Sequence, residues 1–125
     1  MTRISATILV VENGEMLRPL ICEILQREGY DVLAAQDGEA ALSVWKHHQG
    51  PIDLVLTDVV MPKMSGKQLV KRLRLLKPEI KVIYMSGYEL GLLSADNKYD
   101  SNAWFIQKPF RPAELSKLVG EILKS

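Results

Sequence analysis

Five polar residues that can do chemistry follow four short apolar runs of the sequence. Glu12 and Asn13 come after "TILVV", Asp58 after "LVLT", Ser86 after "VIYM" and Lys108 after "WFIQ". Carboxylate and amide oxygens suit a hard divalent cation such as Mg²⁺ or Mn²⁺. An aspartate beside such a cation can attack phosphorus, while a lysine and a hydroxyl bind the transferred group. These residue types indicate phosphoryl-transfer chemistry, provided that the fold brings them together.

The apolar runs predict the strands that would position these residues. The run "ATILVV" has no polar alternation, as expected for a strand covered on both faces. We predict five such strands, at 6–11, 31–35, 52–57, 80–85 and 103–107.

Stretches of helical periodicity alternate with these runs. Gly29 ends the first, Asp37 is a plausible N-cap of the second, and Ser65 with Gln68 forms a capping-box pattern for the third. A less regular helix covers about 89–97, and the last begins at Pro112. Five β–α units in succession predict an α/β fold, a doubly wound parallel sheet with helices on both faces.

The predicted fold brings the five polar residues to one crevice, because ligands of such sheets bind outside the carboxyl ends of the strands. Each residue alone has a simpler explanation. Asp58 would then be a turn or capping aspartate, and Lys108 a solvated lysine ahead of a proline. Chance placement at equivalent strand ends explains the whole set poorly.

Composition limits the classes of function. The chain has 125 residues and a formal net charge of +1, so we expect one domain and no strong attraction to nucleic acid. No apolar stretch is long enough to span a bilayer or serve as a signal peptide. Cys22 is the lone cysteine, which fits a packed thiol in a reducing compartment. We therefore expect a cytoplasmic location.

The motifs around these residues form a recognisable set. "DVVMPKMSG" matches the pattern D-x-x-M-P-x-M-x-G, "MSG" places a hydroxyl after the fourth strand, and "QKPF" follows the fifth. With these motifs the chain resembles, from end to end, the receiver domain of two-component response regulators, most of all receivers fused to hybrid histidine kinases. The resemblance implies a single receiver domain over 1–125, with a flavodoxin-like (βα)5 fold and a five-stranded parallel sheet of order 2-1-3-4-5.

The resemblance also implies an activity and a partner. Such a domain takes a phosphoryl group from the phosphohistidine of a histidine kinase or histidine phosphotransfer domain, using Mg²⁺. It acts as a signalling switch that assists its own phosphorylation and dephosphorylation, not as a turnover enzyme. The surface that changes would include the fourth helix and the fifth strand, through which many receivers form homodimers. The apolar "LGLL" at 90–93 is equally explained as core.

Roles for individual residues follow from the matched motifs. Asp58 is implied as the phosphoacceptor, and Ser86 and Lys108 as the groups that bind the phosphate. Phe105 matches the aromatic whose rotamer reports the switch, although a core aromatic on a strand explains it equally well. The peptide bond before Pro109 is usually cis in this family. The implied metal ligands are Glu12, Asn13, Asp58 and the backbone carbonyl of Val60.

Asn13 departs from the family pattern, which places two acids after the first strand. With Glu12 and Asp58 ionised and Lys108 protonated, two negative charges and one positive charge leave a single net negative charge. A second acid would add another. We therefore predict weaker Mg²⁺ binding and slower phosphorylation than in a receiver with both acids.

Two alternatives remain at the level of sequence. Asn13 also suits a degenerate receiver that acts as a phosphorylation-independent protein-interaction module. A small flavodoxin-like redox or nucleotide-binding enzyme is a third reading. The loop "ENGEM" lacks the Gly-, Ser- or Thr-rich phosphate cradle of such enzymes, and G-x-G-x-x-G and G-x-x-x-x-G-K-[ST] are both absent.

Overall fold

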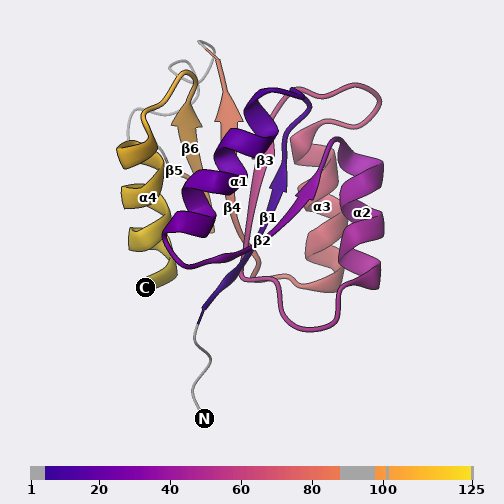
Figure 1. Cartoon of the computed structure of the whole chain (residues 1–125). Coiled ribbons are helices and arrows are strands. Elements are labelled where there is room, and N and C mark those ends of the chain that lie inside the picture. Colours follow the sequence, from indigo (N-terminus) through magenta and orange to yellow (C-terminus); the bar gives the residue numbers. More distant parts are fainter. Residues whose placement is uncertain (1–4, 88–97, 101, 125) are drawn as a thin grey trace.

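A computed structural model describes residues 5–87, 98–100 and 102–124. Strands and helices alternate from β1 to β4, and the strands β5 and β6 and the helix α4 follow (Figure 1). The strands are β1 (Thr7–Val11), β2 (Asp31–Ala35), β3 (Leu54–Asp58), β4 (Lys81–Ser86), β5 (Lys98–Asp100) and β6 (Ala103–Gln107). The helices are α1 (Leu17–Arg27), α2 (Gly38–His47), α3 (Gly66–Leu76) and α4 (Pro112–Lys124). The helix predicted at about 89–97 lies outside the described residues.

The sheet has the predicted topology. Five parallel strands lie in the order β2-β1-β3-β4-β6, which is the order 2-1-3-4-5 when the predicted strands are counted. The short strand β5, which the sequence analysis did not predict, adds to the edge by antiparallel pairing with β6. The predicted α/β fold is confirmed, with this one addition at the edge.

The two faces of the sheet bury separate cores. Alternate residues of β1 point to opposite faces, so Leu9 and Val11 belong to one core and Ile8 and Val10 to the other. The first core includes residues of α2 and α3, and the second includes residues of α1 and α4 (Figure 1). Because both faces are covered, the central strands are continuous apolar runs.

The helix starts follow the predicted capping chemistry. The Asp37 side chain accepts the backbone N–H of Ala40 at 2.8 Å at the start of α2. Ser65 and Gln68 form the complete capping box of α3. Capping satisfies backbone N–H groups that a helix leaves unpaired in its first turn, and it fixes where α3 begins after the Asp58 loop. No helix of the described residues is long and apolar enough to cross a membrane.

Candidate functional site

The register of the sheet brings the predicted residues to one edge. Asp58 is the last residue of β3 and pairs with Met85, so Asp58 and Ser86 end neighbouring strands. Both were predicted to follow their strands, and both instead form the strand ends. A pocket of about 270 Å³ at this edge is lined by Glu12, Asn13, Asp58, Val60, Ser86 and Lys108, among others. The strand-end rule therefore places these residues correctly.

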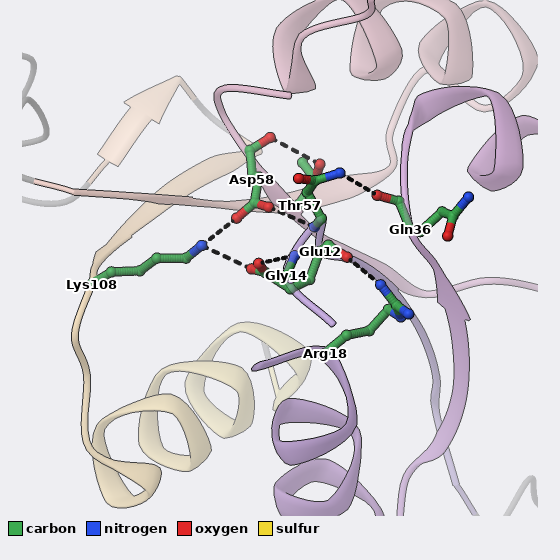
Figure 2. Close-up of polar contacts among 8 residues, drawn as sticks. Glu12, Gly14, Arg18, Gln36, Thr57, Asp58 and Lys108 are labelled. Carbon is green, nitrogen blue, oxygen red and sulfur yellow. Dashed lines mark hydrogen bonds and ion pairs between the residues drawn. The ribbon is translucent and has the colours of Figure 1, made fainter. Parts of the chain in front are cut away.

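Lys108 connects the two acids of the pocket (Figure 2). Its Nζ lies 2.6 Å from Asp58 Oδ1 and 2.8 Å from Glu12 Oε1. Asp58 and Glu12 are 5% and 3% exposed, so neither carboxylate is solvated well enough to remain ionised without partners. The Lys108 ammonium group forms an ion pair with both carboxylates.

Backbone N–H groups complete the hydrogen bonding of the two acids. The N–H of Asn13 donates to Asp58 Oδ2 at 2.9 Å, and the N–H of Gly14 donates to Glu12 Oε2 at 2.8 Å. Each carboxylate thus has one oxygen on Lys108 and the other on the loop after β1. This loop is therefore the part of the chain that orients both acids.

The pKa values of Glu12 and Lys108 are both shifted upward. Burial raises the pKa of Glu12, and Asp58 adds to the rise, while Lys108 and the Gly14 N–H oppose it. Burial alone would lower the pKa of Lys108, but its hydrogen bonds to Asp58 and Glu12 outweigh this and the net shift is upward. Both groups favour their protonated forms, as expected where carboxylates outnumber cations.

The Asn13 side chain, unlike those of Glu12, Asp58 and Lys108, bonds to a residue outside this cluster. It is exposed, and its Nδ2 donates to the backbone carbonyl of Gln36 at 3.4 Å, near the long limit for a hydrogen bond. Its firm contact with the site is instead the backbone N–H on Asp58. Asn13 thus contributes a backbone donor to the pocket, while its amide group bonds to Gln36, the residue after β2.

Phe105 and Pro109 lie beside the pocket residues along β6 and the turn after it. Phe105 is 1% exposed, and its ring packs against Tyr84 with centroids 5.5 Å apart. In this structure it is a core aromatic, one of the two readings that the sequence left open. The peptide bond between Lys108 and Pro109 is cis, which is the geometry that the family resemblance implied.

Two residues that support the site were missed. Arg18 Nη1 donates to the backbone carbonyl of Glu12 at 3.0 Å (Figure 2). Gly66 packs so closely under Asp58 that a Cβ there would collide with the Asp58 backbone oxygen. The glycine that ends the quoted motif "DVVMPKMSG" is a signal for Gly66, whereas no local pattern points to Arg18.

The donor set fits a hard divalent cation. Glu12 and Asp58 supply carboxylate oxygens, and Val60 lines the same pocket. Within the described residues no group of three or more His, Cys, Asp or Glu side chains is placed to hold a metal. A cation here would therefore rely on two carboxylates plus carbonyl, amide or water oxygens.

Comparison with known proteins identifies the family of this fold and site. Residues 8–120 match the response regulator receiver domain. The chain is 38% identical over 120 residues to the sensor kinase CckA of Brucella abortus, covering 96% of this chain and 13% of that protein. It is 32% identical to the response regulator receiver protein CpdR of the same organism, covering 94% and 93% of the two chains.

Solved structures agree with the sequence comparison. The receiver domain of the hybrid histidine kinase CckA superposes with a TM-score of 0.79 at 31% identity, over 94% of this chain and 99% of that one. The chemotaxis response regulator CheY4 of Vibrio cholerae gives 0.81 at 25% identity, over 95% and 99% of the two chains. With its parallel sheet and its strand-end cluster of acids and lysine, the chain belongs to the receiver domain family of two-component signalling.

Proposed function

We propose that Asp58 accepts a phosphoryl group from a phosphohistidine of a histidine kinase or histidine phosphotransfer domain, in a Mg²⁺-dependent reaction. The observation that carries the proposal is the buried Asp58 carboxylate, which lines a pocket and is held there by Lys108 and the Asn13 N–H. A carboxylate that only stabilised the fold would not need to face such a pocket.

The proposed step is a displacement at phosphorus. A carboxylate oxygen of Asp58 forms the new P–O bond as the P–N bond of the phosphohistidine breaks. The electron pair of that bond returns to the ring nitrogen, which takes a proton from water. Before transfer, the Lys108 ammonium and the Asn13 N–H fix the orientation of the carboxylate, so the chain contributes mainly positioning and charge.

Lys108 and Ser86 would bind the new phosphoryl group. Lys108 already reaches Asp58 Oδ1 at 2.6 Å, so its ammonium is in place to neutralise added negative charge. Ser86 ends the neighbouring strand and lines the same pocket. When bound by Glu12, Asp58 and the Val60 carbonyl, with or without the Asn13 amide, Mg²⁺ would supply charge neutralisation for the phosphoryl oxygens.

The proposal extends to the partner and to the parent chain. The chain spans 13% of the CckA sensor kinase but 93% of CpdR, so its relatives include both a receiver within a longer kinase and a chain of similar length. In either setting the phosphoryl donor is a phosphohistidine protein. The proposed switch and homodimer surface consists of the helix predicted at about 89–97, which lies outside the described residues, and the strand β6, which the structure describes.

One observation favours a second candidate function. The Asn13 amide bonds to Gln36 and brings no charge, so the pocket lacks one acid of the family pattern. A receiver that binds the cation too weakly for phosphorylation would act as an interaction module in its unphosphorylated form.

Intact-mass analysis with a small phosphoryl donor tests the proposal. Phosphoramidate carries a P–N bond like that of phosphohistidine, and we expect wild-type chain with Mg²⁺ to gain one phosphoryl group. Asp58→Asn should gain none, whereas Asp53→Asn, which alters another aspartate of the same segment, should behave as wild type. Labelling of Asn13→Asp but not of wild type would favour the interaction module. No labelling of either would contradict the proposed chemistry.

A further inference from the structure

Asn13 and Gly14 form the single Asn-Gly pair of the sequence; Asn97 and Asn102 precede Lys98 and Ala103. The pair lies in the loop between β1 and α1, and the Asn13 side chain is exposed. Asn-Gly is chemically special, because glycine has no Cβ to hinder approach of its backbone nitrogen to the preceding side-chain amide. The position that departs from the family pattern is therefore also a reactive one.

The local contacts favour reaction at this pair. The N–H of Gly14 donates to Glu12 Oε2 at 2.8 Å, so a carboxylate already contacts the proton that must leave the attacking nitrogen (Figure 2). The Asn13 side chain donates a 3.4 Å hydrogen bond to the backbone carbonyl of Gln36, which holds it only weakly. Its amide carbon can therefore turn towards the Gly14 nitrogen without breaking a strong bond.

We propose that Asn13 is a site of spontaneous deamidation, and that its aspartate product supplies the second acid that the pocket lacks. The consequence for Mg²⁺ rests on the proposed function, whereas the chemistry at Asn13 does not. As Asn13 converts to aspartate, the net charge of the pocket would change with time from one negative charge to two.

The reaction balances with water as the single co-reactant. The Gly14 nitrogen bonds to the side-chain carbonyl carbon of Asn13, its proton passes to the Glu12 carboxylate and on to the departing nitrogen, and ammonia leaves. Water then opens the five-membered imide at one of its two carbonyls. Opening at the backbone carbonyl gives isoaspartate, and opening at the side-chain carbonyl gives aspartate. The net change is amide plus water to carboxylic acid plus ammonia.

The two products should differ in the pocket. Aspartate keeps the backbone path, so the Asn13 N–H can continue to donate to Asp58 while a carboxylate replaces the amide. Isoaspartate inserts a methylene into the chain and displaces Gly14, whose N–H orients Glu12. We expect the aspartate form to bind Mg²⁺ severalfold more tightly than fresh protein, and the isoaspartate form not to.

Timed peptide mapping of the intact chain tests the chemistry. The chain would be aged at neutral to mildly alkaline pH and digested with trypsin, and the peptide 4–27 would be followed for conversion of an amide to an acid. Asn102 in the peptide 99–117 is the internal control. Asn13→Gln is the matched variant, because glutamine cyclises far more slowly, and Glu12→Gln should slow the reaction. Isoaspartyl methyltransferase distinguishes the two products.

The outcomes separate this proposal from the proposed function. Conversion at Asn13 with Asn102 unchanged, and calorimetric Mg²⁺ affinity of the purified aspartate form matching Asn13→Asp, would support it. An unchanged Asn13 while a synthetic peptide 4–27 converts would overturn it, as would an aspartate form with unaltered Mg²⁺ affinity. Failure of phosphoramidate to label Asp58 in every form would overturn the proposed function and leave the mass result at Asn13 intact.

Discussion

At the amino ends of the parallel strands the charged side chains of Asp53, Lys77 and Lys81 bond to the backbone, whereas at the carboxyl ends charged side chains also bond to one another. Asp53 Oδ2 accepts the Thr7 N–H at 2.8 Å, and Lys77 Nζ donates to the Ile52 carbonyl at 2.8 Å. Lys81 Nζ likewise donates to the carbonyl of Ile122 at 3.0 Å. These charges join neighbouring elements, which is a structural task.

The carboxyl end places charge differently. Lys108 contacts two nearly buried carboxylates, and a pocket opens beside them. Concentrating like charges in a buried site costs stability unless a ligand offsets it. The comparison therefore distinguishes polar residues that join elements of the fold from polar residues that we propose bind a ligand. The substitutions below compare these two groups.

A matched pair of glycine substitutions should give the largest difference. Gly66→Ala should lower the free energy of unfolding by about 3 kcal/mol, since the new Cβ collides with the backbone oxygen of Asp58. Gly120→Ala, in α4 next to the amino-end contact at Ile122, meets nothing within 4 Å. It should raise stability by about 0.5–1 kcal/mol through helix propensity. Urea unfolding measures both, and equal effects would show that the Asp58 loop has no special packing.

Lysine substitutions compare the two ends directly. Lys108→Met should cost about 2 kcal/mol, because Glu12 and Asp58 then face each other without a cation, discounted for partial exposure of the lysine. Lys77→Met removes one hydrogen bond to a backbone carbonyl and should cost about 1 kcal/mol. Adding Mg²⁺ should restore stability to Lys108→Met and not to Lys77→Met. A cation effect on both variants would mean that Mg²⁺ acts outside the pocket.

The sequence predicted the strands and helix starts better than it predicted the chemistry at the carboxyl ends of the strands. The strands were recognisable because strands covered on both faces cannot alternate with polar residues, and Ser65 with Gln68 is a local capping signal. Asp58 and Ser86 could be placed because parallel strand ends meet at one edge. Their chemical roles remain predictions.

What local patterns could not predict depends on rotamers and distant contacts. Strand β5 is three residues long and pairs at an edge, so it carries no apolar signal. The contact of Arg18 with the Glu12 carbonyl and the turn of the Asn13 amide towards Gln36 both arise from how α1 and β2 sit beside the loop. Tertiary packing sets such contacts, and no spacing in the sequence encodes them.

Restoring the second acid should change metal affinity without changing the fold. Asn13→Asp adds a carboxylate beside two others, and a unit charge pair at about 4 Å in an effective dielectric near 20 is worth about 4 kcal/mol before desolvation offsets most of it. We expect Mg²⁺ binding to tighten severalfold, which corresponds to about 1 kcal/mol. Calorimetric titration of fresh protein measures it, with Asn102→Asp as the control for added charge elsewhere. Unchanged affinity would show that Glu12 and Asp58 already suffice.

The smallest expected effect is a pH dependence that belongs to the carboxyl end. Because the folded-state pKa of Glu12 is raised above its ordinary value of 4.5, its contribution to stability is fully present below that value and is lost as pH rises through the folded pKa. Wild-type protein without Mg²⁺ should therefore gain stability relative to Glu12→Gln as pH falls from neutral into this window, since glutamine does not titrate.

Thermal unfolding of both proteins across this window measures the difference. A difference that stays constant with pH would mean that Lys108 and the Gly14 N–H fully offset the burial of Glu12. A rise towards acid pH that Mg²⁺ abolishes would show that proton and cation compete for the same negative charge. Such competition would distinguish the carboxyl end of the sheet from the amino end. At the amino end, each carboxylate and ammonium group described above already bonds to the backbone.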